Sequence, residues 1–448
     1  MSQLIYNFRY PFNSLGDFFS GLYFLNMEAL HLTVGLVFYL FFIIKISINK
    51  HFPIALRLTT IYFAGTIFNN YAYTFFRITI AEFFGILSVI YFIKNRKFHS
   101  NPISNYMFFF FFVALVHLLI LSIFNEAIME TLGLMRLAVI LKIFVLSMNI
   151  LILFQYLKDE DLLKKFVLES IFLFNIVAIC YIIQILVFIS GTLPYGSFSP
   201  AGWSESIIPS FGSTSIERGH LGKFFVPLYP LYLFAYMKYS TKKSLILFLL
   251  IAFLNFSASS YMFLLMYLFL TFLLFRKELK KIIFLAILFI SFILFYFHEQ
   301  IFTLFLKVYK LAILQDSEGG RSFSLLLPIL ENYNFLGYGY GGSTFRNLHG
   351  IAGLDLNNSI VAFFGQLSFI GIILLQSFMY MILKIKLNIS GISNKFKSEK
   401  KLLFISLFTL LLIFSADILY FVPTVWLPIV IIYIYLLIKK RSILANNL

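Results

Sequence analysis

Long apolar stretches alternate with short polar or basic segments along almost the whole chain. A helix that crosses the hydrocarbon core of a bilayer needs about 20 predominantly apolar residues. The pattern therefore predicts an all-α polytopic membrane protein with about 12–14 transmembrane helices, in which residues 1–448 form a single integral membrane domain. The predicted spans are 30–49, 53–70, 72–93, 105–124, 133–156, 166–189, 220–237, 244–256, 261–275, 282–298, 358–383, 402–420 and 424–438.

Composition supports this class of protein. The chain is 61% hydrophobic and only 12% charged, whereas a soluble domain is about half apolar and a quarter charged. The single cysteine, Cys180, lies inside an apolar run, which excludes a disulfide framework and a cysteine metal site.

The net charge of +16 does not indicate nucleic-acid binding, because the basic residues cluster at the ends of predicted spans. Cytoplasmic loops of membrane proteins carry an excess of Lys and Arg. Seven alternate connections form such a set, which we expect to be cytoplasmic. They contain Lys45 and Lys50, 94–97, 158–165, 238–243, 276–281, 384–401 and 439–441. This assignment places the N-terminus outside and the C-terminus inside. Residues 244–275 are then predicted to cross twice, with a break at 257–260, because basic clusters flank both ends.

Two long connections fall on the opposite face, at 191–219 and 299–357. The first ends in a group of cationic side chains, Arg218, His220 and Lys223, interspersed with glycines. An arginine at a membrane interface can simply extend its charged head to water. The clustering of three cationic residues favours an anion site instead.

Arg321 lies in the second long loop, after two acidic residues and Gly319-Gly320. A local ion pair with Asp316 or Glu318 is one interpretation. The other is bidentate recognition of phosphate oxygens, which suits the planar guanidinium group. Arg218 and Arg321 together would hold a diphosphate without a metal, and no metal-ligand spacing or Walker loop occurs in the sequence.

The same loop supplies further candidates. Tyr338 and Tyr340 alternate with glycines, which fits either a mobile loop whose rings stack on sugars or a compact turn. His349 and Asp355 are the plausible general bases for a sugar hydroxyl, although a surface histidine without a role is an equal alternative. Within the predicted spans, Arg77 and Glu82 are expected to pair on one helix.

Several of these residues resemble a known signature. Gly320-Arg321, then Leu336-Gly337-Tyr338-Gly339, then the segment from Asn357 to Gly371 resemble the C-terminal motifs of the O-antigen polymerase and ligase superfamily. Arg218 is similar to the arginine in the preceding periplasmic loop of that family. The resemblance covers roughly residues 190–375. Three positions depart from the family pattern: Asn357 replaces a histidine, Gln366 a glutamate and Asn334 a proline.

The resemblance implies a glycosyltransferase with type-C-like architecture in the bacterial inner membrane, acting at the periplasmic face on undecaprenyl diphosphate-linked oligosaccharide. The absent histidine favours a repeat-unit polymerase for O-antigen or capsule over a ligase. In that interpretation Arg218 and Arg321 bind the diphosphate, His349 or Asp355 serves the acceptor, and His220, Lys223, Tyr338, Tyr340 and Asn357 contact substrate. No cofactor is expected, and a chain-length regulator is a possible partner. The rival functions are a ligase, a lipid-oligosaccharide flippase and a membrane O-acetyltransferase.

Overall fold

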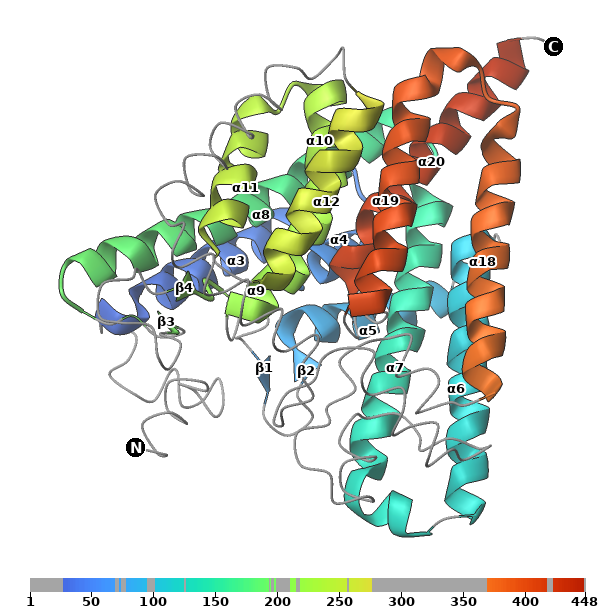
Figure 1. Ribbon diagram of the computed structural model, residues 1–448, viewed down its shortest axis with the longest axis horizontal. Coiled ribbons are helices and arrows are strands. Elements are labelled where there is room, and N and C mark those ends of the chain that lie inside the picture. The colour runs from blue at the N-terminus through green and yellow to red at the C-terminus, as the bar shows by residue number, and fades with distance from the viewer. Residues whose placement is uncertain are drawn as a thin grey trace.

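The protein is described from a computed structural model. The description covers residues 27–68, 72–73, 78–94, 101–124, 126–192, 194, 197–198, 210–214, 218–255, 258–275, 369–416 and 422–446. Helices dominate these residues, and the strands form two short antiparallel hairpins (Figure 1). In the first hairpin β1 (Ala72–Tyr73) pairs with β2 (Ile78–Thr79), and in the second β3 (Ser197–Phe198) pairs with β4 (Ser210–Phe211).

A helix lies at each predicted span except 282–298, which is outside the described residues. In the first half these are η2 (Met27–Ala29), α3 (Leu30–Ser47), α4 (Ile54–Gly65), α5 (Ile80–Ile93), α6 (Pro102–Phe124), α7 (Glu126–Tyr156) and α8 (Glu160–Ile189). In the second half they are α9 (Arg218–Phe225), η3 (Val226–Leu228), α10 (Tyr229–Tyr239), α11 (Lys242–Leu254), α12 (Ala258–Leu274), α18 (Phe369–Ser390), η5 (Asn394–Phe396), α19 (Lys397–Ala416) and α20 (Pro423–Asn446).

Within the part of the chain that the structure describes, five helices are long and apolar enough to cross a membrane. They are Met27–Ser47, Pro102–Leu121, Leu137–Tyr156, Glu160–Ile189 and Phe369–Ser390. Shorter apolar helices lie at Ile54–Gly65, Ile80–Ile93 and Phe263–Leu274. Apolar side chains are exposed along their outer faces, such as Ile44, Phe112 and Tyr380. Exposed apolar surface of this kind is unfavourable in water but carries no free-energy penalty in lipid. Together with the helical content, it shows that the chain is an all-α membrane protein.

Several predicted spans differ from the helices at their ends, as α18 does by running on to Ser390, and two differ in kind. The span at 72–93 begins too early, because residues of its first part form the β1–β2 hairpin and α5 begins at Ile80. Thr79 caps α5: its hydroxyl accepts the Glu82 N–H, and the Glu82 carboxylate accepts the Thr79 N–H. The span at 220–237 is not one helix. Pro227 and Pro230 lack the N–H that an uninterrupted helix needs, and the 3-10 turn η3 separates α9 from α10.

The prediction of two helices within 244–275 is confirmed, but the break lies earlier than the predicted 257–260, because α11 ends at Leu254 and α12 begins at Ala258. Helices α11 and α12 are separate, and Lys401 Nζ donates to the carbonyl of Leu274 at the end of α12. Lys401 belongs to α19, whose first turn also meets the end of α10 through the Lys238–Glu399 ion pair. The end of α12 and the start of α11 therefore lie on one side of the bundle.

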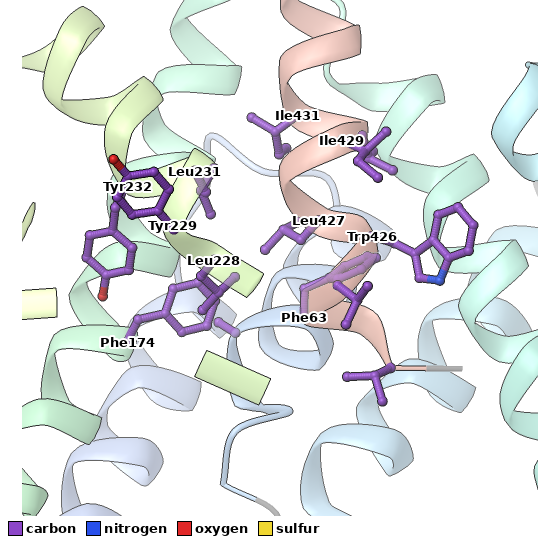
Figure 2. Close-up of a cluster of buried hydrophobic side chains, with 14 of the residues drawn as sticks. Phe63, Phe174, Leu228, Tyr229, Leu231, Tyr232, Trp426, Leu427, Ile429 and Ile431 are labelled. Carbon is purple, nitrogen blue, oxygen red and sulfur yellow. The ribbon is translucent and has the colours of Figure 1, made fainter. Parts of the chain in front are cut away.

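The centre of the bundle is an apolar core around α20. Figure 2 shows Leu427 and Ile431 on α20 pointing toward side chains from α8, η3 and α10, whereas Trp426 and Ile429 point to the other side of the helix. Trp426 is fully buried and lies near the rings of Tyr106 on α6 and Phe378 on α18. One helix near the C-terminus thus joins the two halves of the sequence.

Candidate functional site

Basic residues from distant parts of the sequence gather at one end of the bundle, which we call the lysine end (Lys238, Lys401, Lys439 and Lys440 with Glu160 and Glu399). Lys238 pairs with Glu399, and Lys439 pairs with Glu160. Both ammonium groups also lie 5.3 Å from the centre of the Tyr435 ring, within the range of a cation–π interaction. Four connections that the charge pattern assigns to one face therefore meet in space.

Two more contacts extend the lysine end. Lys440 Nζ donates to the carbonyl of Asn388 at the end of α18, at 2.7 Å. Lys164 on α8 lies 5.9 Å from the ring centre of Tyr239 on α10. Burial, with help from the negative charge of Glu160, raises the pKa of Tyr239, so its phenol stays neutral beside this lysine.

The opposite end, the hairpin end, contains β1–β2, β3–β4 and the first turn of α9. In Figure 1 these elements lie below α10 and α11, whereas the C-terminus and the connection from α10 to α11 lie at the top. The predicted loop 191–219 reaches this end, and the structure ends it before Arg218, where α9 begins.

The three cationic candidates of the first loop lie together on α9. Arg218 is the first residue of this eight-residue helix, His220 and Lys223 follow within it, and Lys223 is partly exposed. No acidic residue occupies the first turn of α9. The unpaired N–H groups and the dipole of a helix N-terminus favour an anion, and in the sequence the acidic Glu217 directly precedes Arg218.

The inner face of α9 explains why the helix packs where it does. Leu221 and Phe225, four residues apart, are buried. The Phe225 ring stacks on Phe248 of α11 with 4.8 Å between ring centres. Burying these two side chains fixes which side of α9 faces the bundle.

The remaining candidates lie outside the described residues. They are Arg321, Tyr338, Tyr340, His349, Asp355 and Asn357, together with the whole predicted loop 299–357. The structure therefore places Arg218, His220 and Lys223 on one helix and leaves their relation to Arg321 a prediction. Among the residues that the structure describes, no group of three or more His, Cys, Asp or Glu side chains is placed to hold a metal ion.

A polar cluster inside the bundle was not predicted from the sequence as a unit. Asn149 on α7 accepts hydrogen bonds from Thr59 on α4 and Ser88 on α5, at 2.8 and 2.6 Å. Its amide nitrogen donates to the carbonyl of Gly85, at 3.1 Å. The only signal in the sequence is an asparagine within an apolar run, which does not name its partners.

The expected pairing of Arg77 with Glu82 stays a prediction, and the structure shows another partner for Glu82. Arg77 is outside the described residues, and Glu82 forms an ion pair with Lys142 of α7 at 2.9 Å. Both side chains are about a quarter exposed. One carboxylate oxygen of Glu82 caps α5 and the other pairs with Lys142. The Glu82 carboxylate therefore links α5 to α7.

The geometry defines an all-α polytopic membrane protein with one strongly ionic end and one end built from hairpins and a short cationic helix. Comparisons with protein-family models, with curated proteins and with solved structures found no match to this chain.

Proposed function

We propose that this protein polymerises lipid-linked oligosaccharide repeat units, using the hairpin end as its active face. The observation that carries the proposal is α9, which holds Arg218, His220 and Lys223 within one short helix and has no acidic residue in its first turn. A diphosphate on a lipid carrier is an anion that reaches such a site from the bilayer. The resemblance of residues 190–375 to O-antigen polymerases supplies the reaction class.

In the proposed reaction, an acceptor hydroxyl oxygen of one lipid-linked unit bonds to the anomeric carbon of the growing glycan. The bond from that carbon to the diphosphate oxygen breaks, and undecaprenyl diphosphate leaves with the electron pair. The hydroxyl proton passes to His349 or Asp355. Arg218 and Arg321 stabilise the negative charge that develops on the diphosphate, and stabilisation of this kind often lowers the barrier more than any other effect in an active site.

The sidedness of the charges fits this proposal. Lysines concentrate at the opposite end from α9, and the positive-inside rule assigns the lysine end to the cytoplasm. The hairpin end would then face the periplasm, where lipid-linked repeat units are joined. A ligase would use the same face with a lipid A-core acceptor, and a flippase would move the same lipid without joining it.

A complementation experiment tests the proposal. A deletion strain of the host would receive wild type, Arg218→Ala, Arg321→Ala or Arg321→Lys, and surface glycan would be separated on a gel beside membrane protein levels. Lys243→Ala is the matched control, because Lys243 is an exposed cation at the other end. We expect the arginine variants to lose long chains and to keep single capped units.

Other outcomes would contradict it. Loss of even the single capped unit would indicate a ligase or a flippase. An unchanged ladder in all arginine variants, at normal protein levels, would exclude the proposed site.

A further inference from the structure

A carboxamide is buried at the hairpin end of the bundle. Gln184 lies in the apolar run of α8 and has no exposed surface. Burying an amide in apolar surroundings costs free energy unless its hydrogen bonds are made. The arrangement of its partners therefore indicates what this side chain does.

Gln184 joins a loop backbone to a histidine. Its Oε1 accepts the backbone N–H of Ser213 at 2.7 Å, which identifies the other end of the amide as the nitrogen. That nitrogen lies 2.9 Å from Nε2 of His31, the second residue of α3. His31 Nε2 is then the acceptor, and its ring is neutral with the proton on Nδ1.

The same loop is held at two further points. Ser213 Oγ donates to the carbonyl of Val177 on α8 at 2.6 Å, and Thr214 Oγ1 donates to the carbonyl of Ile67 after α4 at 3.2 Å. Ser213 has φ of 53°, a left-handed conformation that a serine adopts only when its surroundings impose it. Ser213 and Thr214 are buried, so these bonds are shielded from water.

The position of this anchor relative to α9 gives it a consequence. Thr214 precedes Arg218 by four residues, and α9 starts at Arg218. Because only three residues separate Thr214 from Arg218 in the sequence, we expect a displacement of Ser213 to move the first turn of α9. A shift of about 1 Å in a positioning element can lower a reaction rate on the order of a hundredfold.

We propose that Gln184, with His31 and Thr214, is a positioning residue that sets the place of Arg218. The expected effect of Gln184 on activity rests on the proposed function. Its expected effect on the position of α9 rests on the hydrogen bonds alone. Gln184 acts through the Ser213 backbone and does not touch substrate.

The test combines a physical and a chemical readout. The physical readout is the rate at which a maleimide labels Lys223→Cys in a Cys180→Ala background, in membrane vesicles. The chemical readout is the length of the glycan ladder in the otherwise wild-type chain. The variants are Gln184→Met, which keeps length but loses both hydrogen bonds, and Gln184→Glu, which keeps the acceptor for Ser213. The control is Ser170→Ala, a buried serine on the same helix whose hydroxyl has no partner among the described residues.

We expect Gln184→Met to change the labelling rate severalfold and to lower polymer output by on the order of tenfold or more. Gln184→Glu should restore the labelling rate, and Ser170→Ala should change neither readout.

Normal labelling and a normal ladder for Gln184→Met at normal protein levels would overturn the inference. If Gln184→Met does not accumulate, Thr214→Val decides, since altered labelling supports the anchor and unchanged labelling refutes it. Altered labelling in a protein that proves not to polymerise glycan would retain the anchor and reject the proposed function.

Discussion

At the lysine end, Lys238 and Lys439 reach across to Glu399 and Glu160 from helices that are far apart in the sequence. At the hairpin end, Gln184 and its partners hold the chain with neutral hydrogen bonds. The first arrangement closes the bundle with opposite charges. The hydrogen bonds around Gln184 hold the chain at the hairpin end without an acidic side chain. They therefore do not offset the positive charge of α9. The difference is between an end held by ion pairs and an end held by neutral hydrogen bonds beside the short helix that carries Arg218 and Lys223.

The largest expected effect on stability comes from removing one partner of the buried ion pair. Glu399 is 1% exposed, and its Oε2 has no hydrogen-bond partner within the described residues. Lys238→Met would leave this carboxylate without its ammonium, which costs about 3–5 kcal/mol in buried pairs. Thermal unfolding of the purified protein in detergent would measure the loss.

The double variant Lys238→Met/Glu399→Leu supplies the control, because it removes both charges. It should recover most of the stability. If Lys238→Met alone unfolds at the wild-type temperature, the pair does not hold the lysine end.

A smaller loss is expected from crowding the hairpin end. A Cβ on Gly65 would lie 2.0 Å from the Tyr39 hydroxyl, and Tyr39 is fully buried. Gly65→Ala should destabilise the protein by about 1–3 kcal/mol, as overpacked cores do. At the lysine end, a Cβ on Gly391 meets nothing within 4 Å, so Gly391→Ala is the matched control. Equal unfolding temperatures for both variants would contradict the packing of α3 on α4.

The neutral cluster between the two ends should contribute less. Asn149→Leu would leave the Thr59 hydroxyl without its acceptor, at a cost of about 1–2 kcal/mol. The unfolding temperature should fall by less than in Lys238→Met. Thr59→Val in the same assay removes only one hydrogen-bond donor, so it should lower stability less than Asn149→Leu. A larger loss for Thr59→Val would show that Asn149 is not the centre of the cluster.

The smallest effect is expected at the exposed ion pair. Lys45 and Glu169 lie 2.6 Å apart, but the lysine side chain is 41% exposed. Solvent and salt screen such pairs, so Lys45→Met should change stability by less than about 1 kcal/mol. Thermal unfolding at low and high salt would check this. If Lys45→Met lost as much stability as Lys238→Met, burial would not explain the difference between the two ion pairs.

The sequence predicts the spans because run length and hydrophobicity act locally, and it predicts which connections share an end because lysines mark one face. It does not predict that α5 starts at Ile80, since a two-residue strand leaves no periodic signal. The sequence also does not predict the hydrogen bond between Gln184 and Ser213. The two residues are 29 positions apart, and only the packed helices bring them together.

The central claim is that the hairpin end joins lipid-linked oligosaccharides through Arg218. The most direct measurement incubates the purified protein with lipid-linked repeat units extracted from the deletion strain and follows glycan length on a gel. The account predicts that wild type produces a ladder and releases undecaprenyl diphosphate, and that Arg218→Ala produces neither. Failure of the wild type to elongate the glycan, or a ladder from Arg218→Ala as long as that of the wild type, would contradict it.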